Sequence, residues 1–166
     1  MFQISTCNKK YEFKKGISVV EILIAVFVIS VSLSVLLGMT AFSIKNSTSI
    51  KETVRANALA QEEMEAVRNF RDGTKWAING LGVLNLDTIY HLATTTDNPT
   101  EWSFVSGEET INGFGRKVVL SRVYRDDNDN ISQTGTEEDP NTKKVTVTVS
   151  WGSKEVEIAT YLTNWR

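Results

Sequence analysis

The apolar residues of this chain are concentrated in one stretch near the N-terminus. No residue from Ile22 to Leu37 is charged. With its apolar flanks the stretch reaches about 20 residues, the length that a helix needs to cross roughly 30 Å of hydrocarbon. The serines at positions 30, 32 and 34 are compatible with such a helix, because a serine hydroxyl can bond the carbonyl one turn earlier. The pattern predicts a transmembrane helix over residues 17–42.

After Phe42 the chain becomes polar but keeps a helical period. Apolar residues recur on one broad face at about 100° per residue, and charged residues fall mostly elsewhere. The apolar face comprises Ile50, Val54, Ala60, Met64 and Val67, and the charged residues off it are Lys51, Arg55, Glu62, Glu63 and Arg68. We expect residues 43–72 to continue the helix, which Asp72-Gly73 then ends. The simplest use of the apolar face is to pack the helix on a sheet of the same chain.

Strand patterns occupy the second half of the sequence. Segments rich in Val, Thr and Ile predict strands at residues 102–105, 116–125, 142–151 and 154–162. Gly152-Ser153 fits a two-residue type II′ hairpin turn with glycine in the first central position. Residues 73–100 predict an irregular connection with a short turn or helix. The expected fold class is α+β, with a long N-terminal helix packed on a small antiparallel sheet in a domain over residues 73–166.

Charge divides the chain into a basic head and an acidic remainder. The 166 residues carry a net charge of −2, and residues 1–16 hold four lysines and one glutamate, which leaves −5 for the rest. The positive-inside rule therefore predicts a single-pass cytoplasmic-membrane protein with its N-terminus in the cytoplasm and residues 73–166 outside. An acidic domain has no basic patch for nucleic acid, so no nucleic-acid partner is expected. The one cysteine, Cys7, excludes a disulfide framework.

A secretory signal peptide is the first alternative for the apolar stretch. Signal peptides have an apolar region of about 7 to 15 residues followed by small residues at the cleavage site. The apolar run here is longer, and bulky residues, Leu36, Leu37 and Met39, stand where small ones are required. The pattern therefore favours a retained helix.

One carboxylate, Glu21, interrupts the start of this apolar segment. The sequence KKGISVVE at residues 14–21, followed by the apolar helix, resembles the N-terminus of type IV prepilins and of the pseudopilins of type II secretion. The resemblance implies that residues 1–16 are a leader peptide, which prepilin peptidase removes after Gly16, and that Ile17 becomes the methylated first residue. Ile17 stands where the family usually has phenylalanine, and Ser18 where threonine is common.

The resemblance also implies a role for Glu21, the fifth residue of the processed chain. A carboxylate at the centre of a membrane helix is unfavourable by about 2.5 to 3.5 kcal/mol on insertion scales, and by less near the interface. Cleavage after Gly16 creates an ammonium at Ile17, about 6 Å from Glu21 along a helix. This amine, or that of a neighbouring subunit, would stabilise the carboxylate and set the stagger between subunits. The alternative is that Glu21 lies at the interface and reaches water.

The family resemblance implies a structural subunit and not an enzyme. Its partners would be prepilin peptidase, other pilin or pseudopilin subunits, the inner-membrane assembly machinery and the membrane itself. The filament would be a pilus or a type II secretion pseudopilus. The rival interpretation is an uncleaved single-pass membrane protein whose outer domain binds a ligand or calcium. A plain anchor has no need of Gly16 and Glu21 at this spacing, which discriminates the two.

An acidic loop over residues 126–140 is the candidate metal site. Asp126, Asn128, Asn130 and Glu137 match positions 1, 3, 5 and 12 of a calcium-binding EF-hand loop. Position 6, which should be glycine, is Ile131, and strand patterns flank the loop where an EF-hand has helices. Two interpretations stay open: a solvated hairpin loop whose Asp and Asn favour turns, and a calcium site of another type.

No other motif indicates catalysis or a cofactor. His91 is the only histidine, and no second nitrogen or thiolate ligand lies near it in sequence. The four tryptophans are expected to pack the sheet against the helix, although an exposed subset would suit subunit contacts or adhesion. They are Trp76, Trp102, Trp151 and Trp165.

Overall fold

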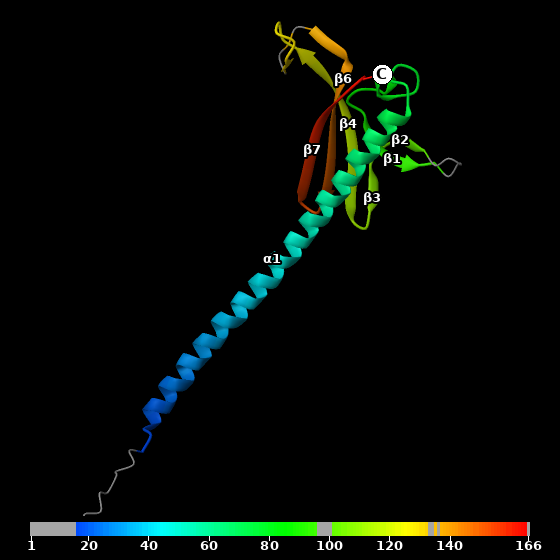
Figure 1. Ribbon diagram of the computed structural model, residues 1–166. Coiled ribbons are helices and arrows are strands. Elements are labelled where there is room, and N and C mark those ends of the chain that lie inside the picture. Colours follow the sequence, from blue (N-terminus) through cyan, green and yellow to red (C-terminus); the bar gives the residue numbers. More distant parts are fainter. Residues whose placement is uncertain (1–15, 96–100, 133–134, 136, 166) are drawn as a thin grey trace, which may run out of the picture. The chain divides into compact units, whose positions relative to one another are not determined.

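The computed structural model describes residues 16–95, 101–132, 135 and 137–165 (Figure 1). It divides into two compact units, Met1–Ser47 and Thr48–Arg166. Lys14 and Lys15, which belong to the prepilin-like segment, lie outside the described residues, as does Cys7. We describe each unit by itself.

A single helix, α1 (Val19–Gly73, 55 residues), contains the apolar segment of the first unit. It begins two residues after the expected start at Ile17, and the Ser18 carbonyl accepts hydrogen bonds from the backbone N–H groups of Glu21 (3.0 Å) and Ile22 (3.3 Å). By length and composition it is suited to cross a membrane. The chain therefore has one long apolar helix near its N-terminus, as the sequence predicted.

The hydroxyl groups between Ile22 and Phe42 all bond within the helix. Ser30, Ser32 and Ser34 donate to the carbonyl four residues earlier at 2.7, 2.8 and 2.9 Å, and Thr40 does the same at 2.9 Å. The predicted back-bonding of the serines is confirmed. It removes the free hydroxyl donors that would be unfavourable in hydrocarbon.

The second unit contains a seven-stranded antiparallel sheet with strand order β2-β1-β4-β6-β7, in which β3 and β5 also pair with β4 (Figure 1). The strands are β1 (Ile89–Thr94), β2 (Trp102–Ser106), β3 (Glu109–Ile111), β4 (Phe114–Arg125), β5 (Ile131–Ser132), β6 (Glu137–Trp151) and β7 (Lys154–Thr163). A 3₁₀ turn, η1 (Leu81–Val83), lies between α1 and β1. The α+β class is confirmed.

Two tight hairpins close the same end of this sheet. Ile111 pairs with Phe114 across Asn112-Gly113, whose φ angles are +51° and +85°, as a type I′ turn requires. Trp151 pairs with Lys154 across Gly152-Ser153, and the φ of Gly152 is +57°. The hairpin predicted at Gly152-Ser153 is therefore confirmed.

The core of the second unit forms where residues 48–73 of α1 lie on the sheet. Ala56, Ala60, Met64 and Val67 on the helix are buried. They belong to one apolar cluster with inward-facing strand residues, namely Leu92, Val118, Leu120, Val145, Val147 and Val149. Two alanines in this row let the helix approach the sheet closely.

The expected helix face was only partly right. Ala60, Met64 and Val67 are buried as predicted, but Ile50 and Val54 are 56% and 63% exposed. The buried row instead follows Ala56 and Ala60, because small side chains allow the closest approach of helix and sheet. Glu63, which was expected off the packing face, is fully buried in it.

Strand β4 does not alternate regularly along its whole length. Val118 and Leu120 face the core, but the pairing with β6 shifts register between Arg122 and Tyr124. This bulge turns Val123 inward, where it is 2% exposed, and leaves Arg122 at the surface. The strand at Ile89–Thr94 was also missed, because residues 73–100 were expected to be irregular.

Candidate functional site

The segment before α1 contains the predicted processing residues. Gly16, Ile17 and Ser18 precede the helix and are exposed, Ile17 by 74%. A Cβ built on Gly16 meets nothing within 4 Å, so alanine fits there without distortion. The peptide bond between Gly16 and Ile17 therefore lies in a non-helical, accessible segment, which is the form that a peptidase binds most readily.

Glu21 lies in the first turn of α1 and is exposed. The next charged residue in the sequence is Lys45, so Glu21 is the only charge on this long apolar surface. A helix N-terminus carries a partial positive charge, which favours a carboxylate in the first turn. No described cation forms an ion pair with Glu21, and its predicted partner, an amine at Ile17, exists only in a cleaved chain.

A buried ion pair joins the helix to the sheet in the second unit. The Glu63 carboxylate is fully buried, and its Oε1 accepts a hydrogen bond of 2.7 Å from the backbone N–H of Leu92 in β1. Its Oε2 lies 3.0 Å from Arg116 Nε in β4, an ion contact without the alignment of a hydrogen bond. Burial raises the pKa of Glu63, although the Leu92 hydrogen bond and Arg116 oppose this shift.

Arg116 forms ion pairs with three carboxylates. Besides Glu63 it pairs with Glu109 in β3, and its Nη1 lies 3.5 Å from Glu62. The Arg116 side chain is 5% exposed, whereas that of Glu62 is 60% exposed. The cluster connects α1, β3 and β4 through one guanidinium, and sequence reasoning missed it because the buried carboxylate stands on an otherwise apolar helix face.

His91 lies near this cluster but does not join it by a hydrogen bond. Its Nδ1 is 3.0 Å from the Gly107 carbonyl, and the side chain is half-buried. It contributes to the field at Glu63 and favours the ionised carboxylate.

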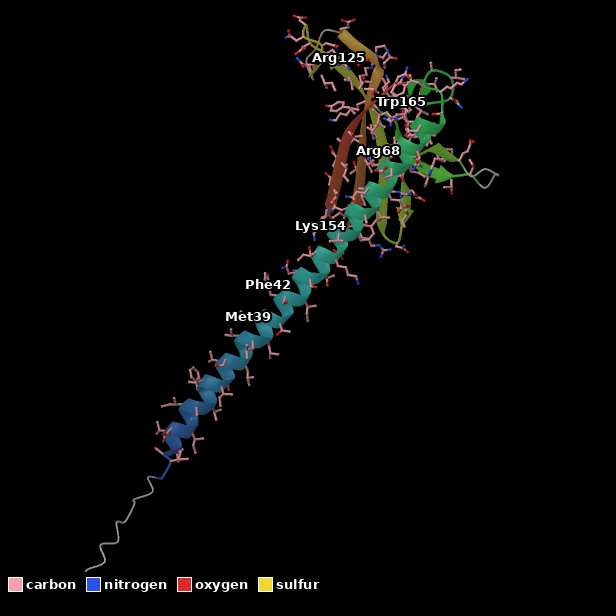
Figure 2. The ribbon with its side chains drawn as sticks, in the orientation of Figure 1. Met39, Phe42, Arg68, Arg125, Lys154 and Trp165 are labelled. Atoms are coloured by element: carbon pink, nitrogen blue, oxygen red, sulfur yellow. The ribbon has the colours of Figure 1, made fainter. Side chains whose placement is uncertain are left out.

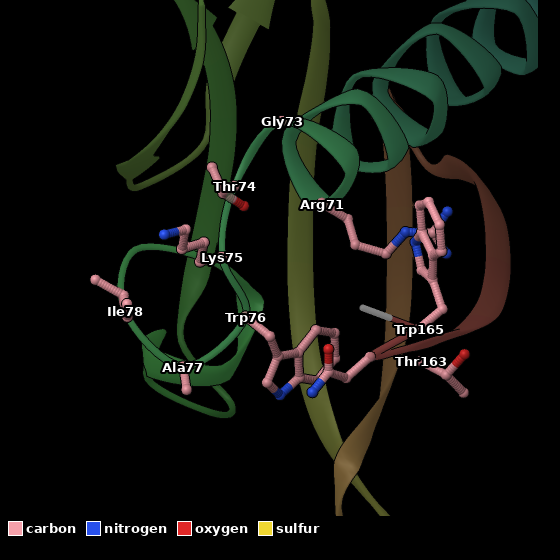
Figure 3. A pocket seen from close by; sticks show the side chains of 10 residues that line it. Arg71, Gly73, Thr74, Lys75, Trp76, Ala77, Ile78, Thr163 and Trp165 are labelled. Carbon is pink, nitrogen blue, oxygen red and sulfur yellow. The ribbon is translucent and has the colours of Figure 1, made fainter.

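A cavity of about 510 Å³ opens at the C-terminal end of α1 (Figure 3). Arg71, Trp76 and Trp165 line it, together with the segment from Gly73 to Ile78. Trp76 Nε1 donates to the Pro140 carbonyl at 3.3 Å, and Trp165 Nε1 donates to Asp72 Oδ1 at 3.4 Å. Both indole N–H groups are therefore engaged within the chain, and the hollow offers mainly apolar surface.

The tryptophans do not all pack in the way that the sequence predicted. Trp76, Trp102 and Trp151 are partly buried against the core cluster, as expected. Trp165 is 59% exposed beside the cavity. Its place in the chain explains this, because β7 ends at Thr163, before Trp165.

The acidic loop is organised by hydrogen bonds and by one arginine. Asp126 Oδ1 accepts hydrogen bonds from the backbone N–H groups of Asn128 and Asn130, both at 2.9 Å, and these bonds lower the pKa of Asp126, the Asn130 bond most. Arg125 Nε donates to Asp139 at 2.7 Å, and its Nη1 lies 3.4 Å from Asp129. Glu137 pairs in register with Arg125. Of the predicted ligands, Asp126 thus lies in a compact turn and already accepts internal hydrogen bonds.

Among the described residues, no group of three or more His, Cys, Asp or Glu side chains has an arrangement that would hold a metal ion. The calcium interpretation remains a prediction. The flanks of the loop are strands, β4 and β6, as the sequence indicated.

Comparisons with protein-family models, with curated proteins and with solved structures gave no match.

Proposed function

We propose that the chain is a type IV pilin-like or pseudopilin-like subunit, which prepilin peptidase cuts after Gly16 and which assembles into a pilus or a type II secretion pseudopilus. In this proposal residues 1–16 are a cytoplasmic leader, α1 anchors the subunit in the cytoplasmic membrane, and the sheet domain lies outside. The subunit has no catalytic role of its own.

The observation that carries the proposal is the position of Glu21. It is the only charge before Lys45 on the apolar helix, and it stands four residues after an exposed, non-helical Ile17. A lone carboxylate on such a surface is unfavourable in hydrocarbon unless a cation reaches it. Cleavage after Gly16 supplies that cation as a new ammonium, on the same chain or on a neighbour, which explains why the carboxylate is there.

The first experiment is mass spectrometry of the N-terminal peptide after expression of the full chain with an active prepilin peptidase. We expect a chain that begins at N-methylated Ile17. Gly16→Ala is the matched control, because a Cβ at this position has no neighbour within 4 Å and leaves the fold unchanged. Loss of cleavage in that variant would therefore report recognition by the peptidase.

The result also decides between this proposal and its rival. A chain that still begins at Met1 beside an active peptidase would refute processing and would leave an uncleaved membrane anchor. Glu21→Gln, which keeps the shape of the side chain and removes its charge, should leave cleavage and membrane insertion intact and reduce assembly. Normal assembly of a processed Glu21→Gln chain would refute the role of the charge.

A further inference from the structure

One end of the sheet domain carries a cationic cavity. The cavity, about 590 Å³, lies between residues 48–55 of α1 and the hairpin turns at Asn112-Gly113 and Gly152-Ser153. Lys51, Arg55 and Lys154 line it, with Glu52 as the one carboxylate. We call the three cations the basic end. It stands out because the chain after residue 16 has a net charge of −5.

Two of the three cations of the basic end, Arg55 and Lys154, are held by contacts within the domain. The Arg55 guanidinium carbon lies 5.6 Å from the centre of the Phe114 ring, a cation–π contact. Lys154 Nζ donates to Ser49 Oγ at 2.6 Å, and Trp151 Nε1 donates to Glu52 at 3.3 Å. Within the described part of the chain, no carboxylate forms an ion pair with Lys51, Arg55 or Lys154, so their charge is available to a partner.

The opposite end of the same sheet is acidic. Asp126, Asp127, Asp129, Glu137 and Glu138 gather where β4 ends and β6 begins, and all five are exposed. Arg125 is the one cation that lines this surface, which we call the acidic end. The five carboxylates therefore outnumber their internal counter-charge.

Strands β4 and β6 fix the separation of the two ends. β4 runs for 12 residues from Phe114 beside the basic end to Arg125 at the acidic end, about 36 Å at roughly 3.3 Å per residue. Lys154 and Arg125 mark the two ends of the sheet domain in Figure 2. Because the antiparallel pair of β4 and β6 runs from one end to the other, it sets the distance between them.

We propose that the basic end of one copy of this chain binds the acidic end of a second copy, so that the sheet domains stack head to tail along the strand direction. This inference deepens the proposed function and rests on it. A contact between two different surfaces of one molecule is heterologous, and it leaves a free basic end and a free acidic end after each addition. Repetition of the contact therefore builds a filament and not a closed dimer. The opposite charges also fix the order of the copies and exclude like ends.

Crosslinking of the full chain in detergent micelles, where the copies are not held side by side in one bilayer, tests this contact. Every chain carries Cys7→Ser, and cysteines are introduced at exposed positions, Ser153→Cys at the basic end and Asn128→Cys at the acidic end. A chain with both cysteines should give a ladder of dimers, trimers and longer products with a bismaleimide crosslinker. Chains with one cysteine each should give a dimer only when they are mixed with one another.

Charge reversal identifies the groups that make the contact. We expect the ladder to fall about tenfold in the Lys51→Glu/Lys154→Glu chain and equally in the Asp127→Lys/Glu138→Lys chain, because each change replaces attraction with repulsion. The chain with all four changes should recover the ladder. The control Arg68→Glu/Lys75→Glu makes the same change of net charge as Lys51→Glu/Lys154→Glu, away from both ends, and should leave the ladder intact.

Three results would overturn the inference. The first is a dimer from the Ser153→Cys chain alone, which would show a symmetric contact between basic ends. The second is a ladder that the charge reversals do not change. The third is a ladder that forms in neutral detergent micelles and disappears when phosphatidylglycerol is added to them, which would assign the basic end to anionic lipid.

The result of the crosslinking test can be told apart from the result of the processing test of the proposed function. A chain that is processed at Ile17 but gives no ladder would refute the stacking contact and leave the pilin-like assignment standing. A ladder from a chain that prepilin peptidase does not cut would support the stacking contact and refute processing.

Discussion

Replacing Arg116 with methionine isolates the energetics of the buried ion pair. The substitution keeps an unbranched side chain on β4 and removes the cation that faces Glu63, whose carboxylate is fully buried. Removing one partner of a buried pair is destabilising by about 3 to 5 kcal/mol, because the other charge stays in a low-dielectric site. We expect Arg116→Met to lower the free energy of unfolding by that amount.

The converse substitution should be far milder. Glu63→Gln keeps a side-chain oxygen for the Leu92 N–H and removes the buried charge, while Arg116 retains Glu109 and Glu62. We expect a change within about 1 kcal/mol, since no uncompensated charge remains. Combining Glu63→Gln with Arg116→Met should be less damaging than Arg116→Met alone, because the two positions are directly coupled.

Tryptophan fluorescence during urea unfolding of the full chain in detergent measures these differences. All four tryptophans lie in the second unit, so the signal reports that unit alone. Arg122→Met is the matched control, because the Arg122 side chain is 54% exposed on the same strand and pairs with Glu138 only at 3.7 Å. It should change stability by less than about 1 kcal/mol.

The pH dependence provides an independent check. Burial raises the pKa of Glu63 above its ordinary value of 4.5, so the folded chain holds this proton more tightly than the unfolded chain. The protonated carboxyl therefore contributes stability that is fully present below pH 4.5 and is lost as the pH rises through the folded pKa. The stability difference between wild type and Glu63→Gln should change over this window. An Arg116→Met chain as stable as Arg122→Met at pH 7, or a difference that does not vary with pH, would refute the reasoning.

Two further predictions concern the loops. Because two backbone N–H groups already engage Asp126 Oδ1 and Arg125 already engages Asp139, calorimetry with calcium at millimolar concentration should give no binding heat. A saturable heat that Asp126→Ala removes would contradict this. Gly113→Ala should lower stability by about 1 to 3 kcal/mol, since its φ of +85° is strained for a side chain, whereas Gly16→Ala should have no effect in the same urea assay.

Sequence periodicity predicted the long elements of this fold and missed the short ones. A helix of 55 residues and four of the strands were expected from their patterns. The strands β3 and β5 have three residues and two residues, too few for an alternation to be visible. β1 was missed because its residues, Ile89–Thr94, follow a stretch rich in turn-forming residues and include a histidine at a half-buried position.

The side-chain clusters could be predicted less well than the elements. Gly16, Ile17 and Glu21 were identified because local spacing alone defines them. The ion pair of Glu63 and Arg116 joins residues far apart in sequence. The sequence around each of these two residues does not indicate that a charge is buried there. The basic end could not be predicted for the same reason, because Lys51 and Lys154 line one cavity only after β7 has folded back toward α1.

The intrahelical bonds of Ser30, Ser32, Ser34 and Thr40 have a mechanical consequence for whatever lies against this part of α1. Each of these hydroxyls donates to a carbonyl of its own helix, so the surface from Ile22 to Phe42 presents no charge and no uncommitted hydroxyl hydrogen. A neighbouring lipid tail or helix meets apolar atoms there. Such a surface resists sliding only weakly, because no polar contact must break when the helix moves along its axis or turns about it. This part of the helix can therefore move from one apolar environment to another without breaking polar contacts. The carboxylate of Glu21 is the only charged group that can fix its position.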